Sequence, residues 1–417
     1  MTADAERTAV TYRYERWRAL ASGVIETAGS TFLLLIAVRW FHAGAWSKAL
    51  IAAGGSAGLM LAPWWVARVE ASRRPVARAA SGVAMLGAAA FALTALVPVL
   101  PVFLAGSVFA MMTAAACVPL LTQVYQENYP ETERGKLFSR TVMIRIATAA
   151  VFSELAGRLL ARHLGWFPGL LAVFAAAFAF TAFCLARVPS RPLAVSGGTH
   201  PFRALRYALE DPLFGRTLIM WMLMGFANLM ILPLRVEYLA NEKYGVRLDG
   251  LPLSAAHVAL LTGVIPNLAR LVMSPVWGWM FDRMNFFALR AALNAGFALG
   301  MLTFFASDSL VGLVVAAVIY GISNAGGDVA WSLWVTKFAP PERVADYMSV
   351  HTCFTGVRGV LAPLVAFQLV AHWSPQAISW LGAGLILLGT LMMFPELKSG
   401  RHPPRARAAA LTEEVTD

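Results

Sequence analysis

The 417-residue sequence predicts an all-α polytopic membrane protein built from two related halves. Three observations support this prediction: the composition, the length of the apolar blocks, and a repeat at about half the chain length. Hydrophobic residues make up 59% of the chain and charged residues only 14%. Because an average soluble domain has about 25% charged residues, the chain is expected to lie in a membrane.

The apolar residues form about twelve blocks, each close to the length of about 20 residues that a helix needs to cross a bilayer. Helix is the expected conformation, because lipid offers no hydrogen-bond partner to free backbone groups. We predict transmembrane helices over residues 19–39, 48–67, 77–97, 101–125, 138–162, 166–187, 213–237, 256–280, 288–306, 310–336, 346–371 and 376–394.

Two distant segments repeat the same residues at the same spacing. Leu59, Pro63, Trp65, Glu70 and Arg78 are matched by Leu271, Pro275, Trp277, Asp282 and Arg290. A second match follows, since Pro130, Glu133 and Arg134 correspond to Pro340, Glu342 and Arg343 with one residue of slippage. In membrane proteins, repeats of this kind enclose a binding site between them. We predict six-helix bundles over 1–187 and 213–395, a central cytoplasmic linker over 188–212, and a disordered cytoplasmic tail over 396–417.

The basic residues are distributed unevenly between the two sides of the predicted bundle. With the N-terminus inside, most of the 34 Lys and Arg fall in inner segments, for example Arg73, Arg140 and Arg203. Because cytoplasmic loops are enriched in basic residues, we expect both termini in the cytoplasm and the protein in the inner membrane. The net charge of +11 therefore does not indicate a nucleic-acid partner. No cleavable signal peptide is expected, because residues 1–18 are polar.

Short motifs follow several of the blocks. Gly278, Asp282 and Arg283 form a G-x-x-x-D-R pattern, and Glu70 takes the acidic place in the first half. The stretch 130–136 reads P-x-x-x-R-G followed by Lys. Together with twelve helices and a long central loop, these motifs resemble the major facilitator superfamily over essentially the whole chain. The resemblance implies two pseudo-symmetric six-helix bundles that rock around a central site.

The motif residues have two interpretations at this point. Acidic and basic side chains at the inner helix ends either form ion pairs that open and close during a gating movement, or anchor the helix ends at the headgroups. We consider gating for Glu70, Asp282, Arg283, Arg134 and Arg343. Two patterns of proton-linked exporters in the superfamily are missing: residues 102–125 carry no charge, and Ser153 to Gly157 stands where a Gly-Pro motif is found. These departures argue against a standard multidrug exporter.

Ionisable residues inside the predicted spans are functional candidates, because a charge near the bilayer centre costs at least about 2.5–3.5 kcal/mol. Those that lie well inside the spans are the acids Glu26, Glu154 and Asp328 and the bases Arg145, Arg270 and Arg358. Glu154 and Arg158 stand four apart in the order that favours a helical ion pair, so we interpret them as a structural pair near the outer face. The remaining three arginines and two acids predict a cavity with surplus positive charge.

An arginine fork binds carboxylate or phosphate groups at two points. We therefore predict a small-molecule substrate with an anionic group. The candidate substrate-binding residues are Arg145, Arg270, Arg358, Asn228, Asn267, Asn324 and Trp331. The alternative for each arginine is a fixed interhelical hydrogen bond. Asp328 and Glu26 are candidates for proton coupling, because burial raises and a nearby arginine lowers the pKa of a carboxylate; the alternative is a permanently paired acid.

The sequence as a whole predicts a secondary active transporter that couples transport to protons and acts as a monomer in the bilayer without a cofactor or a metal. Two alternatives remain open: an exporter of amphipathic or drug-like compounds, and a non-transporting assembly or sensor protein on the same scaffold. A membrane enzyme is not supported, because no H-x-x-x-x-D motif and no D-x-D pair occur; without a G-x-x-x-x-G-K motif, neither is an ATP-driven pump.

Overall fold

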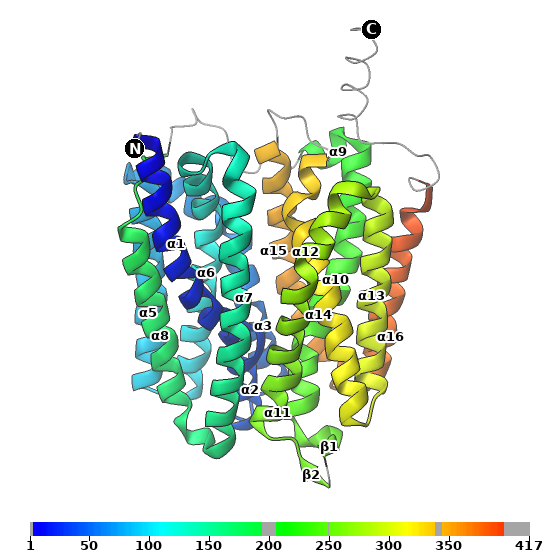
Figure 1. Ribbon diagram of the computed structural model, residues 1–417. Helices are drawn as coiled ribbons and strands as arrows, with labels where there is room; N and C mark the ends of the chain where they lie inside the picture. Colours follow the sequence, from blue (N-terminus) through cyan, green and yellow to red (C-terminus); the bar gives the residue numbers. More distant parts are fainter. Residues whose placement is uncertain (1–2, 194–205, 249, 338–343, 396–417) are drawn as a thin grey trace.

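The computed structural model describes residues 3–193, 206–248, 250–337 and 344–395 as a bundle of long, nearly parallel helices (Figure 1). In the first half the elements are α1 (Ala3–Thr27), η1 (Ala28–Phe32), α2 (Leu33–Arg39), α3 (Ala45–Met60), α4 (Ala62–Ser72), α5 (Val76–Leu96), α6 (Leu100–Asn128), α7 (Glu131–Arg162), η2 (Leu164–Trp166) and α8 (Phe167–Ala186). Here α1, η1 and α2 form one long apolar helix, Ala5–Arg39.

The second half begins with α9 (Tyr207–Glu210), α10 (Pro212–Ala240), η4 (Glu242–Tyr244) and the short antiparallel strands β1 (Arg247–Leu248) and β2 (Leu251–Pro252). It continues with α11 (Ala255–Ala259), η5 (Leu260–Val264), α12 (Ile265–Arg283), α13 (Phe286–Ala306), α14 (Leu310–Leu333), η6 (Trp334–Lys337), α15 (Val344–Leu369) and α16 (Pro375–Met392).

The all-helical, multi-pass fold class is confirmed. Among the described residues, ten helices are long and apolar enough to cross a membrane, and the bent pair α3 and α4 supplies an eleventh candidate. The remaining predicted span, 138–162, is occupied by α7, which carries several charged residues along its length. Each of the twelve predicted spans therefore coincides with a helix or with helices that follow one another in the chain. Ten of these spans, or eleven with the bent pair, also have the length and hydropathy that a membrane span needs.

The predicted helix 48–67 is interrupted. Helices α3 and α4 meet at Leu61 with a bend of 49°. Pro63 stands in the first turn of α4, where its missing N–H removes a hydrogen bond that would have continued α3. The matching Pro275 lies inside the continuous helix α12 instead, so the sequence repeat does not produce the same backbone in both halves.

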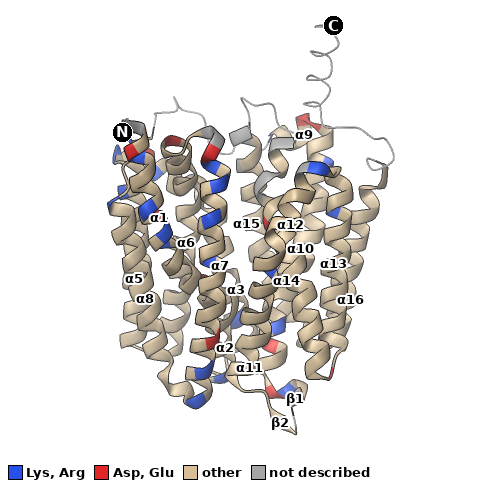
Figure 2. Cartoon of the chain, viewed as in Figure 1, with Lys and Arg blue, Asp and Glu red and all other residues tan. Residues whose placement is uncertain are grey.

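The two halves lie side by side, and we name the two ends of the bundle by what they carry. The termini end is where α1 begins and α16 ends, and the hairpin end carries β1 and β2 (Figure 1). Basic segments of α1 and α7 lie toward the termini end (Figure 2). One hydrophobic core runs through both halves and includes Phe32, Phe174 and Phe304. A smaller core, with Val76 and Leu120, belongs to the first half alone.

The halves contact each other through the helix pairs that the repeat relates. Helix α15 packs against α3, and α7 packs against α11, η5 and α12. Because the repeat matches the segment of α3 and α4 to α12, and α7 to α15, these are two copies of one type of contact. A third contact joins α10 to α2.

Candidate functional site

Four charged side chains from both halves meet in the middle of the bundle. Glu26 comes from α1 and Arg145 from α7 in the first half, and Arg270 from α12 and Asp328 from α14 in the second. Arg270 Nη1 lies 2.5 Å from Glu26 Oε1, and Arg270 Nε lies 2.5 Å from Asp328 Oδ2. Arg145 Nε lies 3.0 Å from the second oxygen of Glu26. We call these four residues the central cluster.

The members of the central cluster differ in exposure. The Arg270 side chain is 6% exposed, whereas Glu26, Arg145 and Asp328 are 27%, 35% and 39% exposed. Arg270 is therefore the buried centre, and the other three groups are reachable. Each charge faces an opposite charge, as expected for ions in low dielectric. The cluster contains two arginines and two carboxylates, so it is balanced and does not carry the surplus positive charge that the sequence predicted.

Of the predicted amide ligands, one joins the central cluster. Asn267 Oδ1 accepts a hydrogen bond of 3.4 Å from Arg270 Nη1, one helical turn away. Asn324 is half-buried on α14, four residues before Asp328. Asn228 is half-buried on α10, and its side-chain oxygen has no hydrogen-bond partner in the part of the chain that the structure describes. The ring of Trp331 lies 5.6 Å from that of His351.

Arg358, predicted to bind substrate with Arg145 and Arg270, lies elsewhere. Its guanidinium is buried inside the second half, where Nη1 donates to the carbonyl of Trp221 on α10. It also closes over Gly225, where an added Cβ would lie 2.2 Å from Arg358 Cζ. The sequence places Arg358 inside a predicted span but does not indicate which neighbouring helix its side chain contacts. This placement removes the extra positive charge from the central cluster.

The candidate gating residues are scattered in the described structure. Arg134 donates to the carbonyls of Gln126 and Tyr129 in its own half. Arg283 is exposed and lies over the ring of Trp279, and Glu70 is half-buried on α4. The side chain of Asp282 and the whole of Arg343 lie outside the described residues. Glu154 and Arg158 form their pair, with 2.5 Å between Arg158 Nε and Glu154 Oε1.

Polar contacts that the sequence analysis did not identify join the halves toward the hairpin end. Lys48 on α3 and Glu237 on α10 form a buried ion pair of 2.6 Å. Arg39 donates to the carbonyls of Ala240 and Leu253. Thr31 and Thr262 share a buried hydrogen bond of 3.1 Å. Lys48 and Glu237 stand at the ends of their predicted apolar blocks, where a charged residue is expected to belong to a loop. The ion pair could be recognised only from the knowledge that these two blocks contact each other.

Beside this contact, the Glu237 side chain is surrounded by further groups. Its Oε1 accepts a hydrogen bond of 2.9 Å from Asn241 and lies 3.7 Å from Lys243 Nζ. Burial and, second, the negative charge of Glu237 raise the pKa of the Tyr244 phenol above its usual value. Tyr244 therefore stays neutral at neutral and mildly alkaline pH, and the charge of this contact rests on Lys48, Glu237 and Lys243.

The fold and the charged centre define a multi-pass membrane protein of two helical bundles. A family model described as the Major Facilitator Superfamily matches residues 253–416. This match covers the second half of the chain and agrees there with the superfamily that the sequence motifs resemble.

Solved structures show the same fold over nearly the whole chain. The nucleoside transporter NupG superposes with a TM-score of 0.71 at 12% identity, covering 93% of this chain and 99% of that one. The human organic anion transporter MFSD10 gives a TM-score of 0.64 at 16% identity, covering 94% and 100%. A D-xylose–proton symporter gives 0.61 at 16% identity, covering 94% and 96%. No curated protein sequence matches the chain.

Proposed function

We propose that this protein is a secondary active transporter that carries a small organic solute with an anionic group together with a proton, by alternating access. The observation that carries the proposal is Arg270, a buried guanidinium held by one carboxylate from each half. The organic anion transporter and the proton symporter among the structures of the same fold make this class of cargo and this coupling reasonable. The substrate itself is not implied by the fold.

The balanced charge of the central cluster supports coupling between the anion and a proton. With two arginines and two carboxylates, an incoming anion would add uncompensated negative charge in a low dielectric, which is unfavourable. If one carboxylate binds a proton, an arginine loses its partner and becomes free to bind the anion. Proton and anion then favour each other's binding, as linkage requires. A cluster of balanced charge therefore favours binding of the anion together with a proton, whereas a cluster with surplus positive charge would bind the anion without a proton.

Asp328 is the better candidate for the proton acceptor. Among the described residues it pairs with Arg270 alone, and it is the most exposed member of the central cluster. Glu26 holds both Arg145 and Arg270 through its two oxygens, so its proton affinity is opposed by two positive charges. In this proposal Glu26 holds the two halves together across the site, and Asp328 exchanges its arginine for a proton.

Alternating access requires that the contacts toward the hairpin end open. The Lys48–Glu237 pair, the Arg39 hydrogen bonds and the Thr31–Thr262 bond all cross between the halves there. With the termini in the cytoplasm of an inner-membrane protein, as the basic residues favour, this structure corresponds to the state closed at the outer face. We further propose that the rocking units are the bundles 1–187 and 213–395 of a single, monomeric chain.

The test uses purified protein in proteoliposomes and a set of organic anions, with nucleosides, sugars and drug-like cations for comparison. The expected result is uptake of an anion that an imposed pH gradient accelerates. Asp328→Asn is expected to bind the anion without responding to the gradient, while Glu154→Gln, outside the central cluster, behaves as the unmodified protein. Uptake by Asp328→Asn that still follows the gradient would contradict the coupling, and transport of neutral or cationic compounds only would contradict the anionic cargo.

A further inference from the structure

A second group of basic side chains lies inside the second half, away from the central cluster. Arg290 on α13, and His351 and Arg358 on α15, surround Trp221 of α10. Each of the three basic side chains is more than nine-tenths buried. We call these four residues the Trp221 cluster. Neither α10 nor α13 contributes a side chain to the central cluster, and α15 contributes none either, so the two groups are separate.

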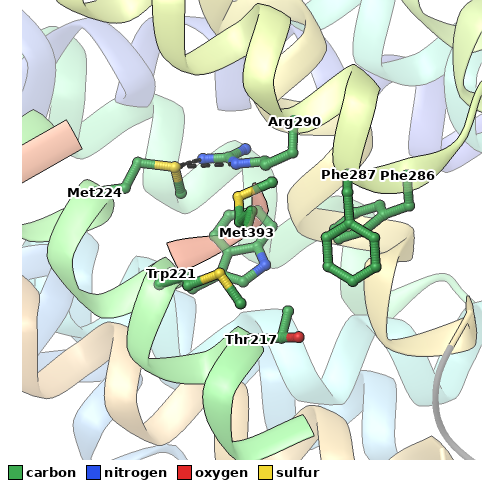
Figure 3. Close-up of a pocket in the computed structure, with 8 residues that line it drawn as sticks. Thr217, Trp221, Met224, Phe286, Phe287, Arg290 and Met393 are labelled. Atoms are coloured by element: carbon green, nitrogen blue, oxygen red, sulfur yellow. Dashed lines mark hydrogen bonds between the residues drawn. The ribbon is translucent and has the colours of Figure 1, made fainter. Parts of the chain in front are cut away.

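Contacts within the Trp221 cluster are close. The guanidinium carbon of Arg290 lies 4.0 Å from the centre of the Trp221 ring, and Arg358 donates to the Trp221 carbonyl. The His351 ring centre lies 5.3 Å from that of Trp221. Arg290 Nε donates to the sulfur of Met224 at 3.0 Å (Figure 3), and a thioether is a weak acceptor. Two positive charges therefore share one apolar and aromatic environment.

Several polar atoms of the Trp221 cluster have no hydrogen-bond partner among the described residues. Arg290 Nη1, Arg358 Nε, Trp221 Nε1 and both ring nitrogens of His351 are buried without a hydrogen-bond partner. Within the part of the chain that the structure describes, no carboxylate pairs with either arginine, whereas Arg270 holds two. Buried ions are normally paired, because an isolated charge in low dielectric is strongly unfavourable. The two guanidinium groups of the cluster are therefore free to accept an anion as a partner.

A small cavity beside the cluster limits the size of that anion. It has a volume of about 10 Å³ and is lined by Arg290, Trp221 and Met224, with Thr217, Phe287 and Met393 (Figure 3). This volume is about that of one water-sized probe, so an organic carboxylate or a phosphate does not fit. Among physiological inorganic anions, a halide ion is the one nearest to this size.

We propose that the Trp221 cluster binds a halide ion, with chloride as the physiological species. The ion accepts hydrogen bonds from Arg290, and its charge offsets those of Arg290 and Arg358. Since α10, α13 and α15 all contribute, the bound ion holds these helices together inside the second half. This site is distinct from the proposed transport site, and chloride is here a fixed ligand of the folded bundle.

The test measures thermal unfolding of the full purified chain in detergent, in sodium chloride against sodium gluconate at equal ionic strength. A ligand that binds only the folded state raises the midpoint in a saturable manner, and we expect a rise of about 2 °C or more with chloride or bromide. Arg290→Met and Arg358→Met are expected to lose this rise. Arg235→Met removes another buried arginine of α10, four turns from Trp221, and is expected to keep it.

An unfolding midpoint of the unmodified protein that is equal in both salts would overturn the proposal and leave water as the partner of these donors. Loss of the chloride response in Arg235→Met as well would overturn it too, since the effect would then follow buried charge in general. If Arg290→Met does not fold, anomalous scattering from bromide in crystals of the unmodified protein decides: a peak beside Arg290 supports the site and its absence contradicts it. None of these measurements uses transport, so they are independent of the proposed function.

Discussion

The hydroxyl groups of Thr31 and Thr262 lie 3.1 Å apart, and each belongs to a π-helical segment, η1 in the first half and η5 in the second. π-Helical turns are rare in proteins, and many of those that occur lie at functional sites. Here the two wide turns face each other between the halves, and the helices that contain them carry Glu26 and Arg270. The contact thus links the two helices on which Glu26 and Arg270 of the central cluster lie.

Removal of the Thr31 hydroxyl is expected to weaken this contact. Thr262 Oγ1 also donates to the Val258 carbonyl at 2.7 Å, so Thr31 supplies the proton of the shared bond. We predict that Thr31→Val lowers the free energy of unfolding by about 1 kcal/mol. The measurement is a double-mutant cycle with Thr262→Val, for which we expect a coupling of about 0.5–1.5 kcal/mol. Additive single effects would show that the bond contributes nothing.

The Lys48–Glu237 pair is expected to be among the most sensitive contacts toward the hairpin end. Lys48→Met leaves the Glu237 carboxylate buried without its main partner, which typically costs about 3–5 kcal/mol. Replacing both residues, as Lys48→Met with Glu237→Leu, is expected to restore most of the stability, because the unpaired charge is gone. The exposed pair provides the control, since Arg158→Gln is expected to change stability by no more than about 1 kcal/mol. Thermal unfolding of the four proteins measures all three effects.

Much of this fold could be predicted from the sequence, because its elements are set by local composition. A run of about 20 apolar residues forms a helix in lipid whatever surrounds it. The break at Leu61 was harder to predict, because Pro63 and Pro275 occupy equivalent places in the repeat but only Pro63 interrupts its helix. The π-helical turns η1 and η5 depend on hydrogen-bond register within long helices, and apolar periodicity does not report that register.

The site was predictable in part, for a related reason. Arg270 and Asp328 are charged residues inside predicted spans, so both are functional candidates, and in the structure these two residues do meet. The sequence does not tell which neighbouring helix such a side chain contacts. From the sequence, Arg358 is therefore predicted to line the central cavity, whereas in the structure it points into its own half, toward Trp221. In the sequence Arg290 is recognisable only as part of the repeat, and its burial beside Arg358 cannot be inferred without the packing of α13.

Arg270 is predicted to need its guanidinium and not only its charge. It meets carboxylates of two helices through different nitrogens, Nη1 and Nε, and a lysine has a single nitrogen for both. We predict that Arg270→Lys folds but transports about 100-fold more slowly, as misplacement of a positioning group typically causes. Initial uptake rates in proteoliposomes give the measurement. Arg162→Lys, exposed at the end of α7, is the control, and an equal loss there would contradict the role of Arg270.

Gly356 allows α15 of the second half to approach α3 of the first. A Cβ added at Gly356 would lie 2.4 Å from the backbone nitrogen of Met60, and backbone cannot move aside as a flexible side chain can. We therefore predict that Gly356→Ala forces the halves apart at this level and destabilises the closed arrangement by about 1–3 kcal/mol. Gly384→Ala on α16 is the matched control, because nothing lies within 4 Å of the added carbon, and we expect it to be neutral or up to about 1 kcal/mol more stable.

Thermal unfolding measures the stability of both variants. The opening between α3 and α15 is reported by the labelling rate of a cysteine introduced at Ser56, which lies against Gly359 on the same contact. Faster labelling in Gly356→Ala than in Gly384→Ala is the expected outcome; equal rates and equal midpoints would show that α3 and α15 are not closely packed in solution.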